Sequence, residues 1–313
     1  MSNEHETRPR IMKDIGGVAL PLLGGGVEAS VYALDDKHVL RRYKPGAKMS
    51  MNTLEKLAHF YRSLNRSVNF AIPDILAIGI SDGSYCTVDR RIHGEEFDQT
   101  LGRLEGTARE KALLSYIQTA EQIQDLHPKY DFYGEVLADK PLHENDWTTF
   151  IRRRLKSDYE SAKEIFDNEV PDMQAVFGFI DTEAEIVSDT KASKLIHGDY
   201  YVLNVLANES GEVSGVLDFN SSDGLTLAGD PRMNVFASLI YLFEGESNAR
   251  PEDAQFVLDY LIDKYGENIK RIVHLYRLYY AIHFASYCKD SDPYTFNWSI
   301  RSLKEHLNSD YAY

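Results

Sequence analysis

Three polar side chains that lie close together in the sequence could share one reaction centre: Asp199, Asn204 and Asp218. Mg²⁺ ions in proteins prefer carboxylate and amide oxygens, together with the oxygens of a phosphate. A carboxylate beside an acceptor hydroxyl can orient that hydroxyl and accept its proton. We therefore expect Asp218 to be the main Mg²⁺ ligand, Asn204 to donate an oxygen to the same or a second ion, and Asp199 to act as the catalytic base.

A β-hairpin would bring these three residues together. Two short apolar runs, residues 205–207 and 213–217, are separated by a polar turn at residues 208–212, which is typical of a hairpin. Antiparallel neighbours face each other across the ladder, so we expect Asn204 to lie opposite Asp218. The alternative is ordinary turn chemistry, because Asp and Asn are common turn formers.

A glycine cluster, Gly24, Gly25 and Gly26, lies between two predicted strands. Without Cβ atoms, backbone N–H groups there could approach a polyphosphate closely. We group Ser30, in the following predicted strand, with these glycines as a nucleotide-binding residue. The alternative is a flexible hairpin turn, since glycine clusters are common in turns.

Arg41 provides a cation for the same site. It shares a strand face with Val39, so its side chain would project from the sheet at a fixed depth below the glycines. Glu55, on the predicted helix that follows, could pair with it and hold it in position. The alternative is a surface charge pair that contributes less than about 1 kcal/mol. Arg42 points to the other face, where we expect it to be solvated.

His197 raises the alternative of a hydrolase with Ser193 or Ser221 as nucleophile. The sequence contains no GxSxG elbow, which such a nucleophile commonly needs. A histidine directly before Gly-Asp in a loop is more typical of a residue that braces the backbone. We therefore expect His197 to support the loop that carries Asp199.

The first ninety or so residues predict a β-rich lobe with one helix. Short β-branched and apolar runs alternate with turn residues from Gly16 to Tyr43, which indicates three antiparallel strands. Residues 51–64 change to helical spacing with one apolar stripe, and residues 75–80 and 85–92 read as another hairpin. We expect residues 1–91 to form an N-terminal nucleotide-binding lobe.

The remainder of the chain is predicted to be mainly helical. Apolar residues recur at helical spacing in residues 107–127, 147–168, 171–189, 230–243, 251–265 and 267–287. The short segment from Arg90 to Phe97 is the only apparent boundary and favours a hinge. We expect an α+β, bilobal architecture, in which residues 92–313 form a larger catalytic and substrate-binding lobe.

Composition limits the classes of partner. With 313 residues, of which 43% are hydrophobic, the chain can build two cores. Its formal charge of -15 argues against a nucleic-acid partner and suits a cationic one better. The N-terminal segment has no apolar export signal, and no segment approaches the roughly 20 apolar residues of a membrane span. Cys86 and Cys288 lie far apart, which does not indicate a disulfide framework. We expect a cytoplasmic protein with no membrane partner.

Taken together, HGDYYVLNVL, then GVLDF, then AGDP resemble the catalytic motifs of aminoglycoside phosphotransferases. The same motifs occur in related choline-kinase-like small-molecule kinases, whose fold resembles that of protein kinases. The resemblance covers most of the chain, because the glycine cluster, the VLR strand, the helix with Glu55 and the YCTVDRRIHGEEF segment follow in the family's order. It implies a bilobal protein-kinase-like fold.

The resemblance also implies roles for residues at matching positions. Asp199 stands in the place of the catalytic base, and Asn204 and Asp218 in the places of the Mg²⁺ ligands. Arg41 stands in the place of the phosphate-binding lysine, with Glu55 as its partner. Arginine is planar and bulkier than lysine, so we expect its contact with the phosphates to differ.

Further matches concern the purine and the catalytic loop. Backbone groups from Asp89 to Arg91 stand where relatives meet the purine, and Asp230, in the Gly-Asp-Pro element, stands where it would support the catalytic loop by hydrogen bonds. Two positions depart from the pattern. Asn220 replaces the glycine that follows Asp-Phe in protein kinases, which argues against regulation of that style, and Asn234 replaces a second aspartate of many relatives.

The sequence thus predicts an Mg²⁺-dependent phosphotransferase that uses ATP or GTP and a hydroxyl of a small molecule. Four acidic residues favour a cationic acceptor, such as an aminoglycoside-type antibiotic in a resistance role or an amino-alcohol: Glu244, Glu246, Glu252 and Asp253. A solvated acidic face is the alternative, and neutral antibiotics or metabolites remain open. The other class of function is a catalytically idle kinase-like protein that binds a nucleotide or a partner. Either a monomer or a homodimer is compatible with the sequence.

Overall fold

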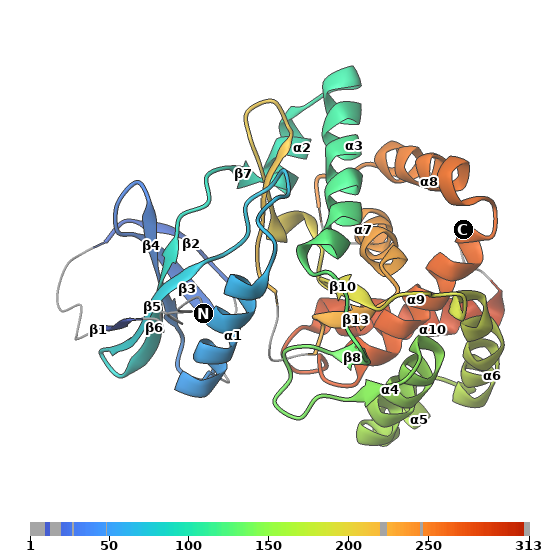
Figure 1. The fold of residues 1–313 in the computed structure, drawn as a ribbon. Helices are drawn as coiled ribbons and strands as arrows, with labels where there is room; N and C mark the ends of the chain where they lie inside the picture. Colours follow the sequence, from blue (N-terminus) through green and yellow to red (C-terminus); the bar gives the residue numbers. More distant parts are fainter. Residues whose placement is uncertain are drawn as a thin grey trace, which may run out of the picture.

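Among the described residues, six strands form the sheet of the N-terminal lobe, in the order β1-β5-β6-β4-β3-β2 (Figure 1). The computed structural model describes residues 10–12, 20–26, 28–47, 49–219, 224–244 and 247–309. The strands are β1 (Arg10–Met12), β2 (Leu22–Gly25), β3 (Ala29–Ala33), β4 (His38–Tyr43), β5 (Ile75–Ser81) and β6 (Ser84–Arg90). β1 pairs parallel with β5, and the other pairs are antiparallel. The predicted strands before Tyr43 and the β5–β6 hairpin are therefore present, although residues 13–19 lie outside the described part.

Helix α1 (Met51–Ser63) packs against β5. Its first turn is capped by the Ser50 hydroxyl, which accepts from the N–H of Thr53 at 3.1 Å. Leu54, Ala58 and Tyr61 are buried along one face, as the apolar stripe predicts. This burial fixes the rotation of the helix and decides which of its other side chains face solvent.

The helical part follows the predicted segments closely, and the described residues also contain α2, η3 and α10, which were not predicted. Its helices are α2 (Phe97–Arg103), α3 (Gly106–Gln122), η1 (Ile123–Leu126), α4 (Trp147–Ser161), α5 (Lys163–Glu169), α6 (Met173–Glu183), η2 (Ala184–Val187), η3 (Val202–Asn204), α7 (Arg232–Glu244), α8 (Pro251–Tyr265), α9 (Ile269–Ala285) and α10 (Pro293–Asn308). The predicted helix at residues 147–168 is divided into α4 and α5, and that at residues 171–189 into α6 and η2.

Two small sheets hold the segments around the predicted reaction centre. One has the strand order β10-β13-β8-β9, and the other has the order β12-β11-β7. Their strands are β7 (Glu95–Glu96), β8 (Tyr133–Glu135), β9 (His143–Glu144), β10 (Lys194–Ile196), β11 (Val205–Ala207), β12 (Val213–Val216) and β13 (Leu227–Gly229). The predicted hairpin is the β11–β12 pair, and β7 adds a third strand to it.

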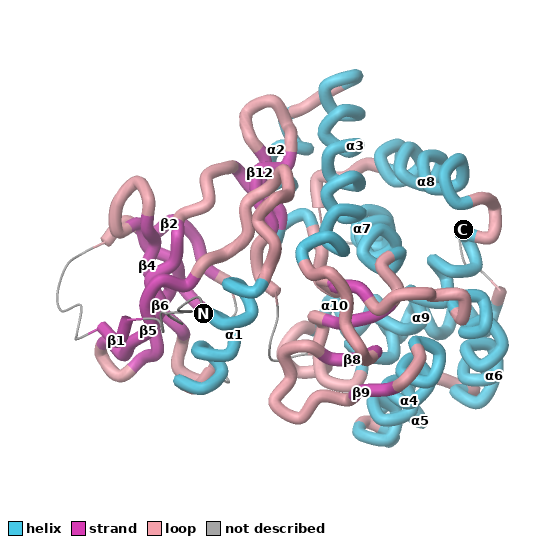
Figure 2. Tube along the Cα trace, viewed as in Figure 1, coloured by secondary structure: helices cyan, strands magenta, loops and turns pink. Residues whose placement is uncertain are grey.

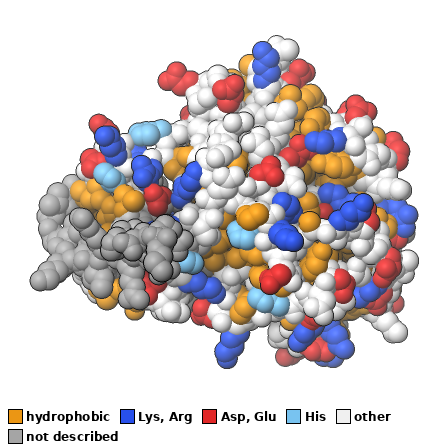
Figure 3. All heavy atoms as spheres, viewed as in Figure 1, with side chains coloured by type: hydrophobic (Ala, Val, Ile, Leu, Met, Phe, Trp, Pro, Cys, Tyr) orange, Lys and Arg blue, Asp and Glu red, His pale blue; other side chains and the backbone are white. Residues whose placement is uncertain are grey.

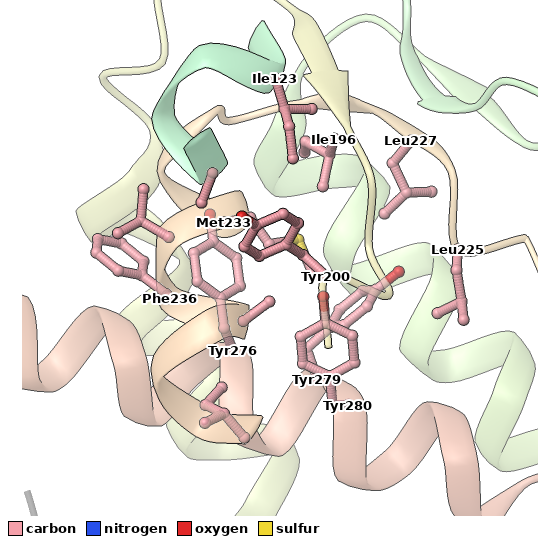
Figure 4. Close-up of a cluster of buried hydrophobic side chains, with 14 of the residues drawn as sticks. Ile123, Ile196, Tyr200, Leu225, Leu227, Met233, Phe236, Tyr276, Tyr279 and Tyr280 are labelled. Atoms are coloured by element: carbon pink, nitrogen blue, oxygen red, sulfur yellow. The ribbon is translucent and has the colours of Figure 1, made fainter. Parts of the chain in front are cut away.

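The core of the helical part is built on α9, which is buried along almost its whole length. Figure 4 shows Tyr276, Tyr279 and Tyr280 from this helix beside Tyr200 and Phe236. Burying a large apolar side chain contributes about 1.5–3 kcal/mol, so this cluster fixes the elements that surround it. One of those elements is the loop after β10, which carries Tyr200.

The β-rich and helical parts meet at the β11–β12 hairpin, as Figure 2 shows by the strands that lie between them. Ala71 forms a β-bridge with β12, and the Phe219 ring lies 5.6 Å from that of Phe60 on α1. The ammonium group of Lys56 also donates to the carbonyl of Leu137 at 2.7 Å. The predicted division into units 1–91 and 92–313 remains a prediction. Within the described residues, no helix is both long and apolar enough to cross a bilayer.

Candidate active site

The loop after β10 places Asp199 and Asn204 in direct contact. The Asn204 Nδ2 group donates to the Asp199 carboxylate at 2.9 Å and to the Asp199 carbonyl at 3.0 Å. An amide whose nitrogen is used in this way presents its oxygen to a further partner. Asn204 thus fixes the orientation of the Asp199 carboxylate and keeps an oxygen donor of its own.

Asp218 follows β12 on the neighbouring segment. The N–H of Leu217 donates to the carbonyl of Asn204 at 2.8 Å, and the pairing of Val205 with Val216 places Asn204 opposite Leu217. The predicted pairing of Asn204 with Asp218 was therefore wrong by one residue, because the turn and an irregularity between Leu206 and Ala207 set the register. Asn204 and Asp218 are still brought to the same end of the hairpin.

The backbone at Asp218 is strained. Its φ is +60°, a left-handed conformation that costs a non-glycine residue about 1–3 kcal/mol and persists only where surrounding structure enforces it. The Asp218 side chain remains 52% exposed. Its carboxylate is therefore held at a solvent-accessible edge, where a ligand can reach it.

His197 links the loop that carries Asp199 to the segment that carries Asp218. It is fully buried, its Nε2–H donates to the carbonyl of Leu217 at 2.7 Å, and its Nδ1 accepts from the N–H of Asp199 at 3.2 Å. A carbonyl can only accept and an N–H can only donate, so this arrangement requires the neutral ring. Burial lowers the pKa of His197 to about 4. The ring braces the backbone on both sides of the site.

Gly198 lets the loop pass close to its neighbour. Its φ is +75°, and a Cβ atom built on it would lie 1.9 Å from the carbonyl oxygen of Leu225. The carbonyl of Gly198 accepts from the buried hydroxyl of Tyr280 at 2.8 Å. The position of Asp199 is therefore fixed by a close approach that only glycine permits.

Arg41 reaches the site from β4 and lies between two carboxylates. Its Nε is 3.6 Å from Asp89 and its terminal nitrogen is 3.5 Å from Asp218. Burial raises the pKa of Asp89, and the Arg41 guanidinium opposes this rise. The sequence did not identify Asp89 as an ion-pair partner of Arg41. Its position on a strand predicted to lie in the same sheet as Arg41 is the signal that could have revealed it.

Glu55 does not take the place that its position suggested. It lies exposed on α1, and in the described part of the chain no ion pair joins it to Arg41. Neighbouring residues of an α-helix are rotated by about 100°, so burial of Leu54 and Ala58 turns Glu55 outward. The expected pairing of Glu55 with Arg41 was therefore wrong, and α1 instead brings Tyr61 near the guanidinium.

The glycine cluster is partly strand rather than loop. Gly24 and Gly25 belong to β2, opposite Val31 and Ser30, and the N–H of Gly26 donates to the carbonyl of Ala29 at 3.0 Å in the turn. The Gly26 N–H is thus engaged within the turn. Binding of a nucleotide by these glycines and Ser30 stays a prediction.

Lys44 is a cation close to the glycine cluster that was not predicted to belong to the site. Its ammonium group donates to the carbonyl of Gly26 at 2.5 Å. It lies directly after β4, the strand that carries Arg41, and its distance in sequence from the glycines concealed the contact. Lys44 places a second positive charge beside the glycine turn.

The last residue of β6 and the residue after it both use their backbone N–H groups within the N-terminal lobe. The N–H of Arg90 donates to the carbonyl of Asp74 at 3.0 Å, and that of Arg91 donates to the carbonyl of Lys37 at 2.8 Å. These two N–H groups are therefore engaged. Contact between a purine and the backbone of Asp89 to Arg91 stays a prediction.

Asp230 is buried behind the site and has other partners than expected. Its carboxylate accepts from Arg232 Nε at 2.9 Å and from the Tyr276 hydroxyl at 2.9 Å. Among the described residues, its hydrogen bonds thus lead to α7 and α9, and the predicted direct bond to the loop that carries Asp199 is absent. Asn234 supports that loop instead, because it accepts from the N–H of His197 at 2.9 Å and donates to the carbonyl of Leu195 at 3.0 Å.

The donor set at the hairpin end fits Mg²⁺. Asp218 offers a carboxylate and Asn204 an amide oxygen, and Mg²⁺ is commonly held by one or two such groups with phosphates and waters completing its shell. Within the described ranges, no cluster of three or more His, Cys, Asp and Glu side chains could hold a metal ion. A metal here would therefore need oxygens from a phosphate ligand.

The acidic residues after α7 do not form one exposed cluster. Asp253 is buried in an ion pair with Arg109, whereas Glu252 is exposed. The side chain of Glu244 and all of Glu246 lie outside the described part. On the face seen in Figure 3, acidic and basic side chains are interspersed. Asp253 therefore does not favour a cationic acceptor, because Arg109 already neutralises its charge.

Comparison with known proteins identifies the family of the chain. The model of the phosphotransferase enzyme family matches residues 19–265. Among solved structures, the GDP and kanamycin complex of APH(2")-IIia is similar with a TM-score of 0.61 and 16% identity over 95% of this chain and 97% of that one. A macrolide 2'-phosphotransferase type I is similar with a TM-score of 0.51 and 15% identity over 93% and 91%. No curated protein sequence matches the chain.

The fold is thus the α+β, kinase-like fold that the motifs predicted, with an antiparallel sheet lobe and a larger helical part. The chain belongs to the phosphotransferase enzyme family.

Proposed function

We propose that this phosphotransferase moves the γ-phosphate of ATP or GTP to a hydroxyl group of a small molecule and requires Mg²⁺. The observation that carries the proposal is the meeting of a base, an oxygen donor pair and a cation at one place. Asp199 is held by Asn204, Asp218 lies at the end of the same hairpin, and Arg41 contacts Asp218 from the sheet lobe. Phosphoryl transfer needs these groups and little covalent chemistry from the protein.

Each residue has a defined part in the proposed reaction. Asp199 accepts the proton of the acceptor hydroxyl while that oxygen bonds to the γ-phosphorus and the bond to the leaving nucleoside diphosphate breaks. Asn204 holds the Asp199 carboxylate in the productive orientation, which contributes through positioning. Arg41 offsets the charge of the phosphates. When bound, Mg²⁺ neutralises charge on the phosphate oxygens.

The acceptor we propose is an aminoglycoside-type antibiotic or an amino-alcohol, in a cytoplasmic setting that supplies nucleotide and Mg²⁺. The support is the family match and the similarity to proteins described with kanamycin and as a macrolide phosphotransferase. Either a monomer or a homodimer could carry out this reaction, since every residue named above comes from one chain. A rise in drug tolerance when the protein is expressed in a susceptible host would support a resistance role.

Two substitutions test the proposal. Asp199→Asn should lower phosphate transfer by about 100-fold or more, the loss typical of a missing general base, while Mg-nucleotide still raises the melting temperature. Asp218→Asn should abolish that Mg²⁺-dependent rise in melting temperature, which reflects a stabilisation of about 3–4 kcal/mol at a nucleotide concentration far above Kd.

Thermal shift with MgATP and MgGTP, followed by transfer assays against pooled hydroxyl compounds, provides both readouts. Asp263→Asn, the same change at an exposed position on α8, is the matched control and should leave both unchanged. An Asp199→Asn protein with full transfer activity would refute the assignment. Stabilisation of the wild type by neither nucleotide would refute the nucleotide-dependent function.

A further inference from the structure

Arg41 has two carboxylate partners that differ in environment. Asp89 is only 5% exposed and lies 3.6 Å from the guanidinium, whereas the Asp218 side chain, 3.5 Å away, is 52% exposed. An unpaired charge inside a protein is costly, so a buried carboxylate keeps its partner. An exposed carboxylate can exchange a partner for water or another cation at little cost. The two contacts of Arg41 are therefore not equivalent.

The strand register fixes the inner contact. Val39 lies opposite Asp89 and Arg41 lies opposite Thr87 on the β4–β6 pair, so Arg41 and Asp89 are diagonal neighbours on one face of the sheet. Long side chains span such a diagonal. Asp89 is thus attached to a central strand, next to the base of the Arg41 side chain.

We propose that Asp89 is the positioning residue for Arg41, in the role that Glu55 on α1 does not fill. This inference rests on the proposed function. Asp89 anchors the guanidinium from inside the sheet, and the anchored guanidinium no longer depends on Asp218. Asp218 is consequently left available to a divalent cation, while Arg41 remains directed at the phosphates.

This arrangement predicts how the Mg²⁺ requirement should change in a protein without the Asp89 charge. Arg41 would then have Asp218 as its remaining carboxylate partner among those described. The guanidinium would compete with Mg²⁺ for that carboxylate. A loss of Asp89 should therefore appear as a raised requirement for Mg²⁺, which a general loss of folding would not produce.

The pairing itself is tested first in the ligand-free protein. Asp89→Asn, Arg41→Gln and the double variant form a cycle whose unfolding is followed in urea. We expect the double variant to be less destabilised than the sum of the single variants. Additive effects would overturn the inference. Asp89→Glu, which keeps the charge, should recover part of the loss, so that a poorly folded Asp89→Asn protein does not decide the outcome.

The role in metal use is tested by nucleotide binding at increasing Mg²⁺ concentration, measured by thermal shift with ATP or GTP. For Asp89→Asn we expect the half-saturating Mg²⁺ concentration to rise by about tenfold, the lower end of what a nearby charge does to the ionisation of a carboxylate. Asp82→Asn is the matched control, because Asp82 pairs at 3.2 Å with Arg42 on the opposite face of the same strand. It should leave the Mg²⁺ requirement unchanged.

The outcomes separate this inference from the proposed function. An unchanged Mg²⁺ requirement in Asp89→Asn, or a larger change in Glu55→Gln than in Asp89→Asn, overturns the role of Asp89 alone. Wild-type protein that binds neither nucleotide overturns the proposed function and, with it, the metal-related role of Asp89. In that case the ligand-free cycle still measures whether Arg41 and Asp89 are coupled.

Discussion

Replacing Gly198 by alanine is the most direct test of how the fold positions Asp199. The added Cβ would lie 1.9 Å from the carbonyl oxygen and 2.7 Å from the carbonyl carbon of Leu225. Because Leu225 presents backbone atoms there, the contact cannot be relieved by a side-chain rotation. Either the Gly198 loop or the Leu225 segment must move by roughly 1 Å to restore ordinary contact distances.

The expected loss of stability in Gly198→Ala has two parts. A left-handed φ costs an L-residue about 1–2 kcal/mol, and forcing extra volume into a packed site adds about 1–3 kcal/mol. We therefore expect Gly198→Ala to lower the free energy of unfolding by about 2–5 kcal/mol. The hydrogen bond between Tyr280 and the Gly198 carbonyl opposes a movement of the loop. A displacement of about 1 Å at Asp199 should lower phosphate transfer by roughly 100-fold.

Gly83 provides a matched control for this change. Its φ is also +75°, but a Cβ atom there would have nothing within 4 Å. Gly83→Ala should therefore show only the backbone part, about 1–2 kcal/mol, with transfer activity retained. Equilibrium unfolding in urea and a transfer assay at the same temperature measure both effects. Equal destabilisation of the two variants would refute the argument that the approach to Leu225 requires glycine.

Two further predictions concern the groups that brace the catalytic loop. His197 has a pKa of about 4 in the folded protein and an ordinary value near 6.5 when unfolded, so its contribution to stability is complete above pH 6.5 and is lost as the pH falls from 6.5 to 4, by about 3 kcal/mol in total. Urea unfolding across this range should show a shallower pH dependence for His197→Gln than for the wild type, and identical slopes would contradict the neutral, buried ring. Asn234→Leu should destabilise the fold by about 2–6 kcal/mol, because the N–H of His197 and the carbonyl of Leu195 would both be left buried without a partner. A loss below about 1 kcal/mol in the same assay would show that water or a shifted backbone replaces those bonds.

Local patterns predicted much of the fold. Alternating apolar runs with turn residues identified the strands before Tyr43 and the β5–β6 and β11–β12 hairpins, because strand periodicity and turn chemistry depend on neighbouring residues. Helical spacing likewise identified α1, α8 and α9 to within a few residues. The short helix α2 was missed, since a few residues carry too little periodic signal.

Contacts between distant segments were predicted less well. The acidic cluster after α7 included Asp253, which the fold buries against Arg109. Asp230 was expected to bond the loop that carries Asp199, but its carboxylate accepts from Tyr276 of α9 instead, and Asn234 takes the supporting role. In each case the residue type indicated a polar partner without indicating which one the packing would bring near.

The sequence by itself was enough to predict that Asp199, Asn204 and Asp218 lie close together, because a short loop and a hairpin leave those side chains few places to go. Only the tertiary structure decided the partner of Arg41. Spacing suggested Glu55, but burial of the apolar stripe of α1 turns that residue outward, whereas the β4–β6 register holds Asp89 on the face of Arg41. That choice depends on packing between segments far apart in the chain, which local spacing does not encode.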